Sequence, residues 1–254
     1  MKSYRLASLL VASILSTLTS PSRAAGTIPL GEAANFAVLA GSTVTNTGPT
    51  ALFGDVGVSP GTAITDFPPG TFTGTLHSND ANSIQAQADA LSAYNILAGL
   101  TPTQILTGQD LGGLTLTPGV YFFSSTAQLT GTLTLDGQGQ VNPLFVFQIG
   151  STLTTASNSI IFETNGADWS NIYFQVGSSA TLGTNTEFEG TIIAMDSDTL
   201  TTGATVEGSV IALTGAVTLD SNVVVVPEPG SAVLLALGAI SLCGRRKRPL
   251  PSSI

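Results

Sequence analysis

Residues 187–194 read Glu-Phe-Glu-Gly-Thr-Ile-Ile-Ala, and residues 205–212 repeat this pattern as Thr-Val-Glu-Gly-Ser-Val-Ile-Ala. Both copies have the composition of two short β-strands joined at a glycine. Between the copies lies Thr199-Leu200-Thr201, which adds a third short strand. Three strands per repeat predict coils of triangular cross-section, stacked as a β-solenoid in which neighbouring coils share one core.

The Thr-x-Thr unit recurs along the chain with an aliphatic residue at its centre. Its centres are Leu116, Leu133, Leu153, Leu182, Leu200 and Val217, where the units at Leu182 and Val217 are imperfect. The steps between centres are 17, 20, 29, 18 and 17 residues, and the long step indicates an insertion around residues 165–171 or an additional partial turn. Side chains alternate along a strand, so the central residue is expected to point inward and both threonines outward. Stacked coils would then carry two columns of threonine on one outer face.

Both ends of the chain look like targeting segments. Residues 1–24 combine Lys2 and Arg5, an apolar stretch and small residues at Ser22 and Ala24, which predicts a secretory signal peptide cleaved after Ala24. Residues 226–230 read Val-Pro-Glu-Pro-Gly and precede an apolar run, residues 231–243, and a basic cluster, residues 245–248. As a helix this run spans only about 20 Å, short for a bilayer core, although a plain short tail anchor is one interpretation.

The Pro-Glu-Pro, apolar and basic parts in this order resemble the PEP-CTERM sorting signal of Gram-negative bacteria. That resemblance implies an exosortase-type membrane protease as a partner, transient inner-membrane anchoring by residues 231–243, and delivery to the outside or the cell surface. The expected organisation is a signal peptide at 1–24, one domain at 25–226, and a sorting and anchor segment at 227–254.

The body between these segments is strongly acidic. All seven Lys and Arg lie in the two ends, and sixteen acidic residues less Glu228 leave fifteen in residues 25–226, a formal charge of −15. Such a surface repels phosphate backbones and anionic lipids, which argues against nucleic-acid binding. The only cysteine, Cys243, lies in the apolar tail, so the body has no disulfide.

One amphipathic helix is expected over residues 80–98. Ile84, Ala88, Leu91 and Ala98 lie near one stripe, with Tyr94 and Leu97 flanking it, which predicts the face that covers the solenoid. Ser78, Asn79 or Asp80 can cap its start, and Gly99 with a following proline ends it.

Five ordered segments, residues 54–61, 86–94, 111–121, 145–155 and 176–183, resemble the microbial ice-binding protein family. The resemblance covers about residues 30–225. It implies a mostly β fold, a discontinuous right-handed β-solenoid of triangular cross-section with one long helix packed alongside. It also implies adsorption to an ice crystal surface, with inhibition of recrystallisation, modest freezing-point hysteresis or attachment of cells to ice.

Threonine suits such a surface. Its hydroxyl can anchor ordered water, and its β-branch restricts χ1, so little rotamer entropy is lost on docking. Some family members carry a Thr-Ala/Gly-x-Thr/Asn motif on the ice face, which residues 155–158 and 202–205 match, while residues 182–185 and 219–222 depart from it. A threonine can also be simply a good solvent-facing strand residue. The predicted ice-binding residues are Thr132, Thr134, Thr152, Thr154, Thr155, Asn158, Thr181, Thr184, Thr199, Thr201, Thr202, Thr205 and Thr218.

Enzymatic and metal-binding interpretations have weaker support. Glu187 with Glu189, and Asp196 with Asp198, could approach the carboxylate separation used in glycoside hydrolysis, but such pairs are more often solvated edge charges that resist edge-to-edge pairing. His77 is the only histidine and is expected to play a local hydrogen-bonding or surface role; one histidine without cysteines makes no zinc site.

The sequence therefore predicts a secreted, non-enzymatic ice-binding protein without cofactor or metal. The alternative is a structural or glycan-binding protein of the extracellular matrix, with extracellular polysaccharide as its partner and Trp169 with Tyr173 as a conceivable sugar-stacking pair.

Overall fold

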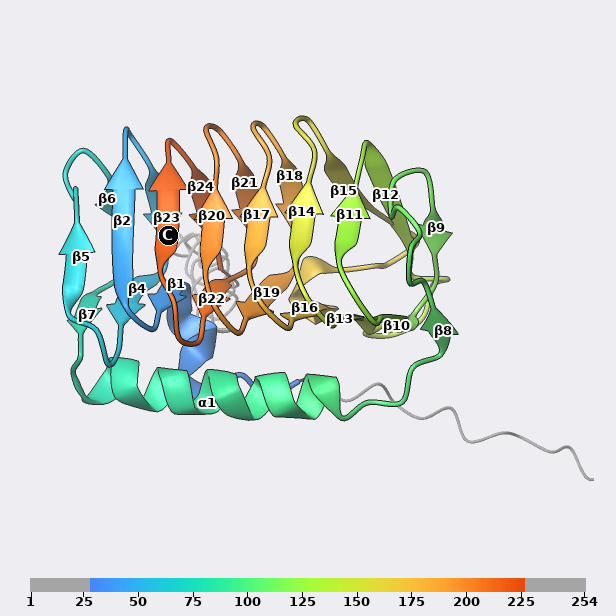
Figure 1. The fold of residues 1–254 in the computed structure, drawn as a ribbon, viewed down its shortest axis with the longest axis horizontal. Helices are drawn as coiled ribbons and strands as arrows, with labels where there is room; N and C mark the ends of the chain where they lie inside the picture. The colour runs from blue at the N-terminus through green and yellow to red at the C-terminus, as the bar shows by residue number, and fades with distance from the viewer. Residues whose placement is uncertain (1–27, 227–254) are drawn as a thin grey trace, which may run out of the picture.

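The computed structural model of this protein describes residues 28–226. The predicted signal peptide and the predicted sorting segment lie outside this range. Three parallel β-sheets, named sheets A, B and C, surround one apolar core, and a single long helix runs along the outside of sheet A (Figure 1). This architecture confirms the predicted β-solenoid with one helix alongside. Within the described residues, no helix is both long and apolar enough to span a bilayer.

Each sheet is continuous along the whole body. In spatial order, sheet A consists of β7 (Leu76–Ser78), β4 (Asp55–Val58), β1 (Phe36–Ala40), β22 (Val210–Ala212), β19 (Thr191–Ala194), β16 (Ile172–Val176), β13 (Phe145–Ile149), β10 (Gly119–Phe123) and β8 (Gln104–Ile105). Sheet B consists of β11 (Ala127–Leu129), β14 (Leu153–Thr155), β17 (Ala180–Leu182), β20 (Asp198–Leu200), β23 (Val217–Asp220), β2 (Thr43–Thr47) and β5 (Ala63–Thr65). Sheet C consists of β6 (Thr71–Phe72), β3 (Ala51–Phe53), β24 (Val223–Val225), β21 (Thr205–Glu207), β18 (Glu187–Glu189), β15 (Ile160–Thr164), β12 (Thr132–Asp136) and β9 (Thr115–Leu116).

The solenoid is discontinuous, because the last coil docks on the first. After β7, helix α1 (Ala81–Ala98) carries the chain along the body to β8 at its other end (Figure 1). The remaining coils then stack back toward the start, where β22, β23 and β24 pair in parallel with β1, β2 and β3. Val38 therefore pairs with Val210, although the two residues are far apart in the sequence.

The near-identical repeats each form the corner between sheets C and A. Gly190 separates β18 from β19, and Gly208 separates β21 from β22. Both glycines have positive φ, 113° and 140°, a conformation that other residues rarely adopt. A Cβ at Gly208 would also lie 2.2 Å from the carbonyl oxygen of Gly190 in the next coil. Glycine is therefore required both for the bend and for the close stacking of the corners.

Aromatic rings stack through the core from coil to coil. The ring centroids of Tyr121 and Phe147 lie 5.4 Å apart, those of Phe147 and Phe174 lie 4.4 Å apart, and those of Phe174 and Phe188 lie 4.7 Å apart. Such contacts contribute beyond the burial of apolar area. The described body contains no Lys or Arg, so this apolar core and the strand ladders carry its stability.

Helix α1 begins one residue later than predicted and buries a different face. Asp80 is its N-cap, and the capping box with Ser83 is complete. The predicted stripe was wrong, because Ile84, Leu91, Ala88 and Ala98 are all exposed. The buried residues are Ser83, Ala86, Ala90, Ala93, Tyr94 and Leu97. Small alanines let the helix lie close to sheet A, so packing distance decided the buried face rather than the size of the apolar side chains.

The predicted insertion is present. Residues 165–168 form a turn, and η2 (Trp169–Asn171) follows it before β16 begins. The extra residues are accommodated between β15 in sheet C and β16 in sheet A, so the coils on either side stay in register.

Candidate functional site

One outward-facing column of threonines runs across sheet B. The strand register places Thr154, Thr181, Thr199, Thr218, Thr45 and Thr65 side by side, one on each of six neighbouring strands. We call these six residues the Thr column. All six side chains are exposed or half-buried. Gln128 on β11, at the edge of the sheet, pairs with Thr154 and ends the column. Sheet B forms the near face of the body in Figure 1.

Buried residues on both sides of each threonine hold the column in place. The residue before it faces the core in β14, β17 and β23, where Leu153, Ala180 and Val217 are buried. The residue after it is buried as Leu182, Leu200 and Leu219 in the successive strands. Because these neighbours are fixed in the core, the threonines cannot rotate away from the surface without disrupting the strand pairing.

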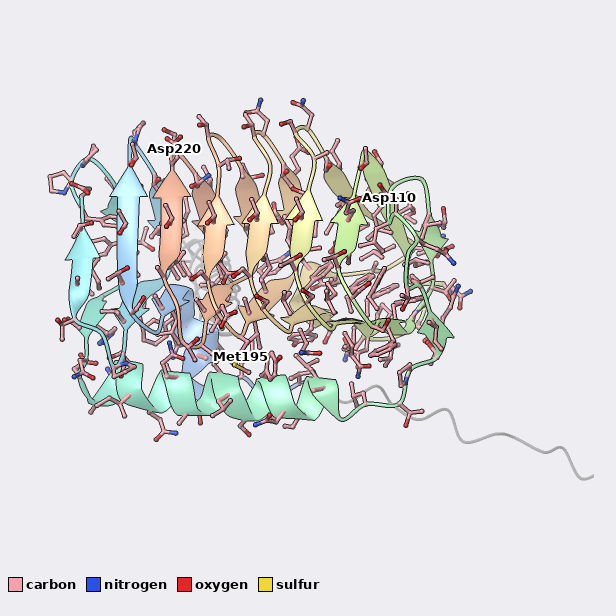
Figure 2. All side chains as sticks on the ribbon, in the orientation of Figure 1. Asp110, Met195 and Asp220 are labelled. Atoms are coloured by element: carbon pink, nitrogen blue, oxygen red, sulfur yellow. The ribbon has the colours of Figure 1, made fainter. Side chains whose placement is uncertain are left out.

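The rows beside the Thr column are small or polar. Two residues before the Thr column lie Thr152, Ser179, Ser197, Ala216, Thr43 and Ala63, and two residues after its first five members lie Ala156, Gly183, Thr201, Asp220 and Thr47. Phe67, two residues after Thr65, is half-buried and packs against the core. Asp220 is the only carboxylate among these residues, at the end of β23 (Figure 2). Its carboxylate accepts hydrogen bonds from the Thr202 and Ser221 hydroxyls. Sheet B is therefore a nearly uncharged surface on a strongly acidic body.

The register differs from the two columns expected from the Thr-x-Thr repeat. Leu153 pairs with Ala180, whereas Leu182 pairs with Leu200, so the centres of the repeat do not all align. The second threonine of one unit, Thr154, therefore stacks on the first threonine of the next units, Thr181 and Thr199. The expectation of two threonine columns was wrong, because the coils differ in length at their corners and shift the units by two residues.

Three of the predicted ice-binding residues lie on a different sheet. Thr132 and Thr134 belong to β12, and Thr205 belongs to β21, all in sheet C. The prediction that they share one face with Thr154 was wrong. Sequence spacing cannot distinguish two faces of a triangular coil when each face carries a short alternating strand.

Thr155 is also not a surface residue. Its side chain is only 3% exposed, and its hydroxyl lies 2.7 Å from that of Thr186. It also accepts a hydrogen bond from the Gly183 backbone N–H at 2.8 Å. Thr155 therefore satisfies polar groups inside the coil, and the expectation that it lies on the outer face was wrong.

The remaining predicted residues form the turn between sheets B and C. The Asn158 N–H donates to the Thr184 carbonyl at 2.8 Å, and the Asn185 N–H donates to the Thr202 carbonyl at 3.1 Å. Asn158 and Asn185 have left-handed φ values of 59° and 54°, and Gly203 occupies the corresponding place with φ 75°. Asparagine and glycine favour this conformation, which explains them in the motif without any ligand. Gly203, and not Thr205, occupies the position that corresponds to Asn158. The motif at residues 202–205 is therefore out of register with the motif at residues 155–158.

The N-terminal coil completes the Thr column with two threonines that the sequence analysis missed. Thr45 pairs with Thr218 across the junction between the last and first coils, and Thr65 pairs with Thr45. Residues 42–45 read Ser-Thr-Val-Thr, a short strand signal that gave the only hint, because the partner residues are distant in the sequence.

Sheet C carries more carboxylates than sheet B, namely Asp136, Glu163, Glu187, Glu189 and Glu207. Glu189 pairs with Glu207 on the neighbouring strand. Burial, together with the charges of Asp168 and Glu207, raises the pKa of Glu163 to about 7. Burial, together with the charges of Glu207, Glu163 and Glu187, raises the pKa of Glu189 to about 8. Because β18 lies between β15 and β21, Glu187 and Glu189 do not protect a sheet edge, contrary to expectation.

The other acidic and aromatic candidates do not converge. Asp198 is buried in the core, where neither carboxylate oxygen has a hydrogen-bond partner, whereas Asp196 is exposed and accepts from the Ser178 hydroxyl. The two aspartates therefore do not share one strand face, as a pair of catalytic carboxylates would require. Trp169 packs against the solenoid core, and Tyr173 packs under the helix.

His77 has the hydrogen-bonding role that was expected, but it is buried. Its Nδ1 lies 2.7 Å from the Asp80 carboxylate at the helix N-cap. Among the residues that the structure describes, no group of three or more His, Cys, Asp or Glu side chains is arranged to hold a metal ion.

The comparisons with known proteins agree with this architecture. A family model described as ice-binding-like matches residues 38–225, and the PEP-CTERM protein-sorting motif matches residues 225–248. An ice-binding protein of Nostoc sp. (strain HG1) is 55% identical over 241 residues, which cover 89% of each chain. An ice-binding protein of Flavobacterium frigoris is 35% identical and covers 79% of this chain and 77% of its own length.

Solved structures show the same fold. The ice-binding protein of the Antarctic ascomycete Antarctomyces psychrotrophicus is 45% identical, with a TM-score of 0.76, over 80% of this chain and 100% of its own. An ice-binding protein from an Arctic yeast is 31% identical, with a TM-score of 0.73, over 80% of this chain and 96% of its own. The alternative of a matrix protein that binds glycans gains no support from these relatives. The sorting motif implies export to the outside or the cell surface, and the chain belongs to the ice-binding-like family.

Proposed function

We propose that this protein binds ice through the outer surface of sheet B, with the Thr column at its centre. The observation that carries the proposal is the column itself, in which six threonines from distant parts of the chain lie in one register on a nearly uncharged surface. Strands lie about 4.8 Å apart, so the column repeats one hydroxyl and one methyl at a fixed interval over about 24 Å. A crystal surface is itself periodic, so many weak contacts can form together.

The physical chemistry of the surface supports the same proposal. Threonine side chains on paired strands lose little rotamer freedom on docking. A charged surface would keep its own hydration shell, whereas sheet C carries five carboxylates and the outer surface of sheet B only Asp220. Relatives with the same fold are named as ice-binding proteins. The proposal includes no catalytic role for the side chains of residues 28–226.

Matched threonine substitutions on two sheets test the proposal. Thr181→Tyr places a ring in the middle of the Thr column, and it is expected to raise the protein concentration needed to inhibit ice recrystallisation at least about tenfold, equivalent to about 1.4 kcal/mol. Thr132→Tyr makes the same change on sheet C and is expected to leave that concentration unchanged. Circular dichroism of both variants checks that they are folded. Loss of activity in Thr132→Tyr with full activity in Thr181→Tyr would move the ice-binding surface to sheet C.

We further propose that the export route follows the two terminal segments. Residues 1–24 would be removed as a signal peptide, residues 231–243 would anchor the precursor in the inner membrane, and an exosortase-type protease would cleave near the Pro-Glu-Pro sequence. Intact-mass measurement of the exported protein tests this route. A C-terminus that still includes the basic cluster at residues 245–248 would contradict it.

A further inference from the structure

The described chain ends on the side of the solenoid rather than at one of its ends. Val226 follows β24, which lies between β21 and β3 within sheet C. Val225 pairs with Glu207 on one side and with Phe53 on the other. The Val226 N–H donates to the Phe53 carbonyl at 3.1 Å, and its side chain is only 8% exposed. The position of Val226 is therefore fixed by the fold.

Val226 occupies the corner between sheets C and A. In the neighbouring coils, Gly54 follows β3 and Gly208 follows β21, and each leads the chain from sheet C into sheet A. Val226 lies between these two glycines: the Gly208 N–H donates to the Val225 carbonyl, and a Cβ on Gly54 would meet the Val226 side chain at 2.7 Å. A triangular coil has three corners, and the corner between sheets C and A is the one that sheet B does not share. In Figure 1, β24 accordingly lies behind β23, on the far side of the body from the viewer.

We propose that attachment through the C-terminus holds this protein with sheet B facing away from the supporting surface, so that it fastens that surface to ice. This inference rests on the proposed function of sheet B. The supporting surface is the cell exterior, to which the processed end stays attached; a precursor anchored in the inner membrane faces the periplasm and meets no ice. Processing near the Pro-Glu-Pro sequence leaves the attachment point directly after Val226, and the geometry depends on that point.

The connection is too short for the body to turn over. The sorting motif matches from residue 225, inside β24, so no separate linker precedes it. Four residues, 227–230, separate Val226 from the apolar run, and at up to about 3.6 Å per residue they reach about 14 Å. In the neighbouring coil, the side formed by sheet C runs from Gly203 in the turn after sheet B to Gly208 at the corner with sheet A, five residues further on, which is about 17 Å of extended chain. The chain therefore cannot pass around sheet C, and on the other side helix α1 adds about 10 Å to the path.

The discontinuous topology sets the orientation of the long axis. In a solenoid wound from one end to the other, the last strand lies at the end, and attachment there leaves the long axis free to point away from the support. Here the last coil docks on the first, which places β24 two strands inside the edge strand β6. Attachment at this side holds the long axis of the body parallel to the supporting surface, so all seven strands of sheet B face outward together.

The natural lack of cysteine in the body allows a direct experiment. Cys243 is the only cysteine, so a chain of residues 28–227 has none. About 80% of this chain covers the Antarctomyces structure along its whole length, which supports folding of residues 28–227 without the terminal segments. Three single-cysteine proteins would be coupled to uncharged beads: Pro227→Cys at the natural exit, Gln128→Cys on the edge strand of sheet B, and Ile105→Cys on β8 at the end of the body.

The readout is the fraction of beads that an ice surface retains at a fixed temperature just below freezing. Beads coupled through Pro227→Cys are expected to be retained at least about tenfold more than those coupled through Gln128→Cys, a difference of about 1.4 kcal/mol. Equal retention of these two, or equal retention of Ile105→Cys and Pro227→Cys beads, would overturn the proposed orientation.

Measurements on the free proteins separate this inference from the proposed function. Each variant, with its thiol blocked, is first tested for inhibition of ice recrystallisation. If the free Pro227→Cys protein is inactive, the proposed function of sheet B fails. If it is active in solution but its beads do not adhere, only the orientation is wrong. A flexible linker of about twenty residues at Gln128→Cys should restore adhesion, because it removes the constraint on orientation.

Discussion

At the scale of single residues, the most unusual side chain is Asp198. It lies in β20 directly beside Thr199 of the Thr column but points into the core, with neither carboxylate oxygen hydrogen-bonded. Burial raises the pKa of this carboxyl well above its ordinary value of 3.8. A carboxyl in this setting stays protonated in the folded protein at pH values where the unfolded chain has released the proton.

Stability is therefore expected to fall as the pH rises. Between about pH 4 and the raised pKa, the folded state binds one more proton at Asp198 than the unfolded state does. The free energy of unfolding then decreases by up to about 1.4 kcal/mol per pH unit. Glu163 and Glu189, whose pKa values are raised to about 7 and about 8, act in the same direction.

Asp198→Asn removes the proton uptake at this site while keeping the shape of the side chain. The variant is expected to show a shallower decrease in the free energy of unfolding between pH 5 and pH 8, measured by urea denaturation. Asp196→Asn, at an exposed turn two residues away, serves as the control and should keep the slope of the parent protein. An unchanged slope in Asp198→Asn would show that Asp198 ionises normally in the folded state.

At the scale of elements, helix α1 illustrates how packing selects a face. Both sides of the helix carry apolar residues, and the larger ones, Ile84 and Leu91, remain exposed. Ala86, Ala90 and Ala93 lie against sheet A, in one cluster with Leu39, Phe36 and Ile193. Met195 lies at the same boundary between the coils and the helix (Figure 2). The short side chains set the distance between the helix and the sheet.

Two matched alanine substitutions test the assignment of this face. Ala90→Leu inserts bulk into the closely packed side and is expected to lower the free energy of unfolding by about 1–3 kcal/mol. Ala88→Leu makes the same change on the exposed side and should stay within about 0.5 kcal/mol of the parent. Thermal or urea denaturation measures both. If Ala88→Leu lowered the free energy of unfolding more than Ala90→Leu does, the stripe of Ile84, Ala88 and Leu91 would be the buried face.

At the scale of the whole molecule, docking of the last coil on the first makes the two halves depend on each other. The first coil is held by helix α1 and by the pairing of β1, β2 and β3 with β22, β23 and β24. A linear repeat protein can lose its terminal coils one at a time, because each repeat contacts only its neighbours. Here the N-terminal coil is covered on both sides along the axis, so it cannot open separately without breaking one of these interfaces.

Unfolding is therefore expected to be a single cooperative transition. Trp169, the only tryptophan, packs against the core in the C-terminal coils, while far-ultraviolet circular dichroism at 222 nm reports on helix α1. The urea midpoints from the two signals should coincide, and Ala90→Leu should shift both by the same amount. Separate midpoints would show that the helix and the first coil detach before the other coils unfold.

Much of this protein follows from local sequence. The paired strands around Gly190 and Gly208 predict the coil and its triangular section, because glycine is needed where a coil bends closely over its neighbour. Asparagine favours the left-handed turns found at Asn158 and Asn185, and the uniformly acidic body argues against nucleic acid as a partner. These are properties of short segments or of overall composition, so the sequence by itself determines them.

Only the tertiary structure decided which threonines share a surface. Thr132 and Thr154 have the same local pattern, but corner lengths send one to sheet C and the other to sheet B. Thr45 and Thr218 are far apart in the sequence, yet they pair because the last coil docks on the first. The same docking decided where the chain leaves the body. A repeating pattern specifies the strand and the direction of its side chains, but the position of each strand around and along the solenoid depends on contacts between coils.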